Sequence, residues 1–181
     1  MADDKFFDEV MSRPFIINAA RGGVTSNNSL KKAIKSGKIS GAVIDCWENE
    51  PDIDRELLEL VDIATTHIAG YSADGKWTAT RMSIENLIDF FNLKVNPNYL
   101  KIPHPLETVI DLQGILEEDQ LSHAVWHTYN PIKESELLNL NPDKFYWFRS
   151  NYPLRREYHA YSIVNATNYT KEILKNLGFN F

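Results

Sequence analysis

Three side chains that could carry out acid–base and anion-binding chemistry follow three separate apolar runs: Arg21, Glu50 and His67. A guanidinium group can hold a carboxylate through two parallel hydrogen bonds. An imidazole can take a proton from a hydroxyl near neutral pH, and a neighbouring carboxylate orients it and favours its charged form. Together these groups suit oxidation of a 2-hydroxy acid. Arg21 would bind the carboxylate, His67 would accept the hydroxyl proton, and a cofactor would accept the hydride.

The elements that must position these side chains alternate along the chain. The expected strands are 15–20, 41–47 and 61–70 (the last running into a loop), and the expected helices are 3–11, 26–37, 54–60 and 72–91. Near-continuous apolar strands are typical of a parallel sheet covered on both faces, and strand–helix alternation predicts an α/β domain. Because the carboxyl ends of parallel strands meet at one edge, the three side chains are expected to converge there.

Each candidate also has a structural explanation. The Arg21-Gly22 pair could be a turn and nothing more, and Glu50 lies in an acidic stretch that a solvated loop would also carry. His67 has fewer structural duties, because it follows a strand in a loop rich in Ala and Gly. Asp45 ends an apolar strand and needs a partner there, so it is either a cap for the next segment or a ligand contact.

Composition excludes several classes of protein. With 43% hydrophobic residues the chain has ample material for a core, and its net charge of −6 argues against nucleic-acid binding. No apolar run approaches the roughly 18 residues that cross a bilayer, so no membrane association is expected. The acidic start MADDKFFDEV is unlike a signal peptide, and the single cysteine, Cys46, fits a reducing compartment, so we expect a cytoplasmic protein. No metal site is expected either, since His104, His123 and His127 offer only one i, i+4 pair.

The composition shifts near residue 94. The expected division is a first domain at 1–93, a proline-containing linker at 94–106 and a second, α+β domain at 107–181. The second domain is expected to contain strands at 107–112 and 157–164, helices at 117–129 and 168–177, and helices or turns over 133–150. It also carries four basic residues, Lys144, Arg149, Arg155 and Arg156. They either form a solvated face or include one arginine, with Arg149 as the candidate, that reaches a phosphate group of the substrate.

Three segments identify a family. IINAARGGV, GAVIDCWENEP and TTHIAGYS closely resemble, in this order and spacing, the carboxyl-terminal half of the nucleotide domain of the D-2-hydroxyacid dehydrogenases. The resemblance implies half of a Rossmann-like parallel sheet domain, NAD as the cofactor, and a catalytic set of Arg21, Glu50 and His67. The cofactor contacts that it implies are Ala19, Ala20, Arg21, Asp45 and Gly70, and the substrate contact is Tyr71.

Two further segments narrow the resemblance to one branch of this family. HIAGYSADGK and the carboxyl-terminal sequence, from FYWFRSNYPLRREYHAYSIV to ILKNLGFNF, are similar to a branch with an added dimerisation domain. That branch oxidises the 2-hydroxyl of 4-phospho-D-erythronate with NAD, in pyridoxal phosphate biosynthesis. The resemblance thus implies a small phosphorylated hydroxy acid as substrate and a homodimer formed through the second domain. The alternatives are a dehydrogenase of another D-2-hydroxy acid, of glycerate or phosphoglycerate type, and a non-catalytic oligomerisation module.

One motif of the family is missing. None of the eight glycines form the G-x-G-x-x-G pattern that cradles a dinucleotide pyrophosphate. We therefore expect the sequence to be the carboxyl-terminal half of a dehydrogenase, and the chain alone to be catalytically silent.

Overall fold

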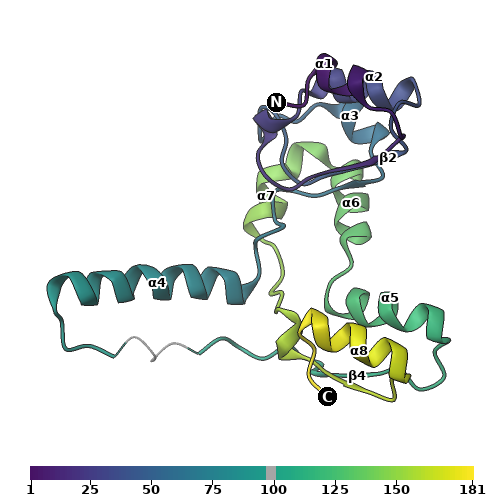
Figure 1. The fold of residues 1–181 in the computed structure, drawn as a ribbon. Helices are drawn as coiled ribbons and strands as arrows, with labels where there is room; N and C mark the ends of the chain where they lie inside the picture. The colour runs from purple at the N-terminus through teal and green to yellow at the C-terminus, as the bar shows by residue number, and fades with distance from the viewer. Residues whose placement is uncertain (97–100) are drawn as a thin grey trace. The chain divides into compact units, whose positions relative to one another are not determined.

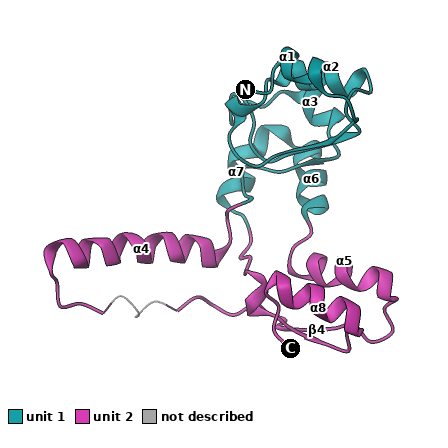
Figure 2. Cartoon of the chain, viewed as in Figure 1, with its two compact units in different colours: residues 1–69, 131–152 teal, residues 70–130, 153–181 magenta. Residues whose placement is uncertain are grey.

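The computed structural model describes residues 1–96 and 101–181, which form two compact units (Figures 1 and 2). The first unit contains residues 1–69 and 131–152, and the second contains residues 70–130 and 153–181. Part of the expected linker, 97–100, lies outside the described residues. On either side of it, 93–96 and 101–108 contain no helix or strand.

A three-stranded parallel sheet organises the first unit, as the sequence predicts. Its strands are β1 (Phe15–Asn18), β2 (Gly41–Ile44) and β3 (Ile63–Ala64), in the order β1-β2-β3. Asn18 pairs with Ile44, and Ile44 pairs with Ala64. The carboxyl ends of the strands are therefore level, and the loops that follow them leave the same edge of the sheet.

Helices α2 (Asn27–Lys35) and α3 (Arg55–Leu60) form the two crossovers, and α1 (Asp4–Glu9) packs against α2. Side chains cap both crossovers: the Ser26 hydroxyl accepts the Ser29 N–H and the Asp54 carboxylate accepts the Leu57 N–H. These caps satisfy amides that have no partner within the helix, and they confirm the start predicted at Ser26.

Two helices from the far end of the sequence complete this unit. They are α6 (Pro131–Leu140) and α7 (Phe145–Ser150), which follows a single turn, η2 (Pro142–Lys144). Leu138 and Phe145 are buried in the same core as Ala42 and Leu57, and the Ser135 hydroxyl accepts the N–H of Ala64 on β3 at 2.9 Å. This segment therefore covers the sheet beside β3, as the teal parts of Figure 2 show.

This arrangement differs from the expected division, which placed all of 107–181 in a second domain. The apolar side chains of 131–152 are buried against the first sheet, and β3 has a free edge whose amide needs an acceptor. Burial and hydrogen bonding together assign the segment to the first unit.

The second unit is built on two parallel strands, β4 (Val109–Asp111) and β5 (Ser162–Val164). Helices α5 (Glu117–Thr128) and α8 (Asn168–Leu177) pack against each other. The expected strand at 157–164 is shorter than predicted, since Tyr158–Ala160 form a single helical turn, η3. The core of the unit is apolar and contains Ile110, Leu112, Ala124, Tyr161, Ile163, Leu174 and Phe179.

Helix α4 (Ala73–Phe91) starts at a buried ion pair in the second unit. The carboxylate of Asp74 accepts two hydrogen bonds from the Arg156 guanidinium, at 2.9 and 3.0 Å, and one from the Glu157 N–H. Burial alone would raise the pKa of Asp74, but these bonds outweigh it and the pKa lies below its usual value. Arg156 is therefore buried and stabilises the start of α4, so it is not part of a solvated basic face.

Four large apolar side chains of α4 are exposed. Met82 is 55% exposed, Leu87 54%, Phe90 81% and Phe91 61%. The helix predicted over 72–91 is confirmed, but the part of the chain that the structure describes leaves these four side chains largely uncovered. No helix among the described residues has both the length and the hydropathy required to cross a bilayer.

Phe145→Ala tests the packing of the late helices on the first sheet. We expect it to lower the free energy of unfolding by about 3–5 kcal/mol, because it leaves a cavity in the core beneath the sheet. Chemical denaturation measures this loss, and hydrogen exchange should show faster opening at Ile63 and Ala64. The control is Tyr146→Ala, since Tyr146 is 68% exposed. Unchanged exchange at β3 in the Phe145 variant would contradict this packing.

Candidate active site

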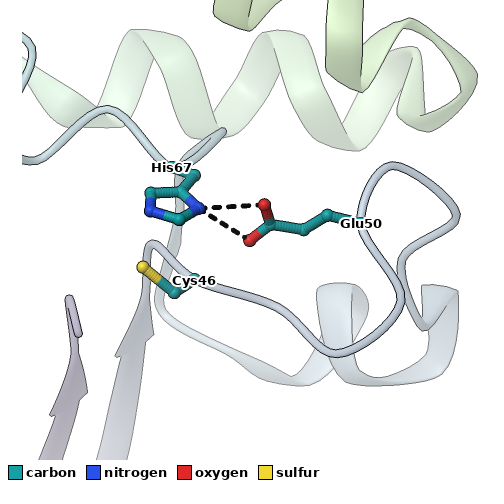
Figure 3. A group of neighbouring side chains, drawn as sticks. All are labelled: Cys46, Glu50 and His67. Carbon is teal, nitrogen blue, oxygen red and sulfur yellow. Dashed lines mark hydrogen bonds and ion pairs between the residues drawn. The ribbon is translucent and has the colours of Figure 1, made fainter. Parts of the chain in front are cut away.

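The site is centred on a hydrogen-bonded pair of side chains, His67 and Glu50 (Figure 3). His67 Nδ1 lies 2.9 Å from Glu50 Oε2 and 3.1 Å from Oε1, and the two side chains are 24% and 23% exposed. Glu50 Oε1 also accepts the N–H of Trp47 at 2.8 Å. The carboxylate is therefore fixed by its own loop and in turn fixes the imidazole. Because Nδ1 faces Glu50, Nε2 is the atom available to a substrate.

The His67 loop is held by the carboxylate of Asp45. Oδ1 accepts the hydroxyl of Thr65 and the N–H of Ile68, both at 2.7 Å, and Oδ2 accepts the N–H of Ala69 at 3.1 Å. Asp45 is only 4% exposed. His67 has a left-handed backbone, with φ of 58°, which is costly for a residue with a Cβ. The two amides that follow His67 reach the same carboxylate, and these bonds offset that cost.

Trp47 joins the Glu50 loop to the His67 loop. Its indole N–H donates to the carbonyl oxygen of Thr65 at 2.8 Å, and the side chain is buried in the core. A substitution of Trp47 that removed this bond would leave the buried carbonyl of Thr65 without its donor. It would also remove a link that fixes the distance between the two loops.

The Arg21 loop packs directly on the Glu50 loop. The buried amide of Asn18 donates to the carbonyls of Arg21 and Cys46, at 3.1 and 3.2 Å. A Cβ on Gly22 would lie 2.0 Å from the carbonyl oxygen of Trp47, so only glycine permits this approach. The Arg21 guanidinium is exposed and donates to the carbonyl of Ala20. The loop is thus held against the catalytic pair while its cation faces solvent.

Two further groups lie near the pair: Cys46, for which the sequence suggested no role in the chemistry, and Arg149, which it offered as a contact to the substrate phosphate. Cys46 is 1% exposed, and its sulfur forms a cluster with Glu50 and His67 in which the three ligand atoms lie within 4.8 Å of one another. Arg149 on α7 donates from Nε to the carbonyl oxygen of His67 at 3.4 Å. The sequence singled out Arg149 as an arginine that could reach the substrate phosphate, but nothing local shows that α7 packs beside His67.

The remaining predicted contacts divide between the two units. Ala19 and Ala20 are exposed at the carboxyl end of β1, and the Ala20 N–H is bound by Asn18 Oδ1 at 3.2 Å. Gly70 and Tyr71 belong to the second unit, where the Lys76 ammonium lies 4.1 Å above the Tyr71 ring. Their roles as cofactor and substrate contacts stay predictions.

A parallel sheet with an acid–base pair at its carboxyl edge is the arrangement expected of a dehydrogenase, and the comparisons with known families agree. Residues 1–69 match the family described as "D-isomer specific 2-hydroxyacid dehydrogenase, NAD binding domain". Residues 102–178 match a domain of unknown function, DUF3410. The fold class, the resemblance and NAD as the cofactor of the matched domain are thereby confirmed.

The most informative relatives are named erythronate-4-phosphate dehydrogenase. The protein of that name from Bacteroides thetaiotaomicron is 46% identical over 91% of this chain, and the one from Porphyromonas gingivalis is 42% identical over 92%. The match covers 45% of each relative, so the chain spans slightly under half of their length. A solved D-mandelate dehydrogenase from Rhodotorula graminis is also similar, at 36% identity, over 49% of this chain and 26% of its own, with a TM-score of 0.46.

The residues at this edge fit the nicotinamide end of NAD. Ala19 and Ala20 are exposed and carry only methyl side chains, so a flat ring can approach the end of β1. The Asp45 carboxylate already accepts bonds from Thr65, Ile68 and Ala69, which shows how it holds the loop. Its additional contact with NAD stays a prediction.

Asp45→Asn tests how the His67 loop is held. The substitution replaces one acceptor oxygen by an NH₂ group and removes the charge, so we expect a loss of about 1–3 kcal/mol in unfolding free energy. Amide exchange at Ile68 and Ala69 should accelerate more than at the strands. Asp52→Asn, at an exposed position of the neighbouring loop, is the matched control. Equal exchange at these two amides in both variants would show that Asp45 does not hold the loop.

Proposed function

We propose that Arg21, Glu50 and His67 form the acid–base and carboxylate-binding part of an NAD-dependent dehydrogenase that oxidises the 2-hydroxyl of 4-phospho-D-erythronate. The observation that carries this proposal is the hydrogen-bonded His67–Glu50 pair at the carboxyl edge of a sheet that matches an NAD-binding domain. The choice of substrate is supported by the relatives named erythronate-4-phosphate dehydrogenase, which are similar over nearly the whole chain.

Each group has a defined task in this proposal. NAD, when bound, accepts the hydride from the substrate carbon. His67 takes the 2-hydroxyl proton at Nε2, and the Glu50 carboxylate stabilises the imidazolium that forms. Arg21 holds the substrate carboxylate, because its exposed guanidinium extends from a loop packed on the Glu50 loop. The bond from Trp47 keeps Glu50 aimed at His67 throughout.

We further propose that Arg149 offers a positive charge to the substrate phosphate. The support is its position, since its Nε is bound to the carbonyl of the catalytic histidine itself. The chain carries a net charge of −6, so a doubly charged phosphate must be offset locally.

The setting of this activity is part of the same proposal. We place the reaction in pyridoxal phosphate biosynthesis in the cytoplasm, with the protein acting as a homodimer through its carboxyl-terminal region. The exposed apolar side chains of α4 are consistent with a covered surface in an assembly. Since the 181 residues contain no G-x-G-x-x-G loop, we also propose that they do not turn over substrate by themselves.

His67→Asn and Glu50→Gln test the acid–base pair. The assay uses a hybrid chain, in which the part of the Bacteroides thetaiotaomicron relative outside the matched region precedes Met1, and follows NADH formation from 4-phospho-D-erythronate. His67→Asn should lower kcat by about 10²–10⁴-fold. Glu50→Gln should also lower kcat with little change in KM, because a glutamine NH₂ group donates to Nδ1 and leaves the proton on Nε2. His123→Asn and Glu59→Gln, both at exposed positions, are the controls. Full activity of the His67 variant would refute the proposal.

Arg149→Gln in the same hybrid tests the phosphate contact. We expect KM for 4-phospho-D-erythronate to rise by about tenfold or more, the effect of losing a charged hydrogen bond, while KM for unphosphorylated D-erythronate stays near its original value. Lys144→Gln, an exposed cation on the preceding turn, is the control. Equal effects on both substrates would mean that Arg149 positions His67 and does not bind phosphate.

A further inference from the structure

Cys46 has no task in the proposed reaction, yet it lies against the catalytic pair. Its sulfur, one Glu50 carboxylate oxygen and one His67 ring nitrogen are all within 4.8 Å of one another (Figure 3). Cys46 and Glu50 come from the loop after β2, and His67 comes from the loop after β3. All three belong to the first unit.

We propose that Cys46, Glu50 and His67 bind a divalent transition metal of the zinc class, and that the bound metal blocks the acid–base pair. Sulfur, imidazole nitrogen and carboxylate oxygen are the donors that zinc prefers, and three protein ligands leave a fourth position for water. The thiolate selects against magnesium and calcium, which bind oxygen ligands. The atoms are already close together, so binding requires small side-chain rotations and no rearrangement of the loops.

The charges around the sulfur favour a cation. Burial and the negative charges of Asp45 and Glu50 together raise the pKa of the Cys46 thiol to about 12, against an opposing effect of Arg21. The carboxylates that disfavour a thiolate favour a divalent ion in its place. On binding, the S–H bond breaks, a sulfur–metal bond forms, and the proton leaves to water.

The surrounding structure holds the ligands in place. Glu50 is fixed by the Trp47 N–H, and the thiol lies 3.6 Å from Asp45 Oδ2. His67 and Glu50 are each about a quarter exposed, so an ion can enter from their side while the sulfur forms the floor. Once the imidazole lone pair is on the metal, it cannot accept a substrate proton. This blocking rests on the proposed function, whereas metal binding itself does not.

The test uses the 181-residue chain and two metals, zinc by calorimetry and cobalt by absorption. Cys46 is the only cysteine in the sequence, so a sulfur-to-cobalt charge-transfer band can arise only from this site. We expect one metal ion per chain, and that band. Cys46→Ser should abolish the band and weaken zinc binding by at least about tenfold. His67→Asn should weaken binding while the band returns at higher cobalt concentration.

Two further arms keep the result decisive. His123→Asn removes an exposed histidine outside the cluster and should change neither metal's binding. Absence of the sulfur-to-cobalt band would overturn the proposed site. So would zinc binding that is lost in the His123→Asn variant but kept in the Cys46→Ser variant. In the hybrid chain, zinc should inhibit reversibly, with release by a chelator, and Cys46→Ser should require at least about tenfold more zinc. Zinc binding without inhibition of the hybrid would refute the proposed inhibition but not the metal site. A hybrid without activity would count against the proposed function alone.

Discussion

The bonds received by the buried carboxylate of Asp45 are the interaction on which the site depends. One side chain at the end of β2 accepts a hydroxyl and two backbone amides from the loop that follows β3. Without those bonds, the left-handed conformation of His67 would have no compensation, and the loop could relax to an extended path. The imidazole would then leave the reach of Glu50. The position of the proton-accepting group therefore follows from a buried carboxylate at the end of β2 that accepts bonds from the loop after β3.

Much of this arrangement could be predicted from the sequence, because it follows from periodicity and strand order. The apolar runs around Ile17, Ile44 and Ile63 specify parallel strands, and parallel strands bring the loops that follow them to one edge. That rule was sufficient to bring together the loops of Arg21, Glu50 and His67. The role of Asp45 was left open, since composition alone does not distinguish a carboxylate that binds loop amides from one that binds a ligand.

The packing of α6 and α7 was not predictable from local pattern. Their residues follow an apparent linker and an independent helix, so composition assigned them to the second domain. The deciding facts are long-range: Leu138 and Phe145 enter the first core, and Ser135 satisfies an amide on the edge of β3. The contact of Arg149 with the His67 carbonyl is a consequence of that packing. The local sequence of α7 does not indicate this contact, because its partner is 82 residues away.

The charged side chains at the site differ in whether they face the protein or the solvent. The carboxylates at the site face inward, where Asp45 is bound by loop amides and Glu50 by His67 and the Trp47 N–H. The cation of Arg21, by contrast, faces solvent from a loop fixed by Asn18 and Gly22. The Arg21 guanidinium is therefore the charged group at this edge that an anion from solvent can contact directly, although the chain carries a net charge of −6.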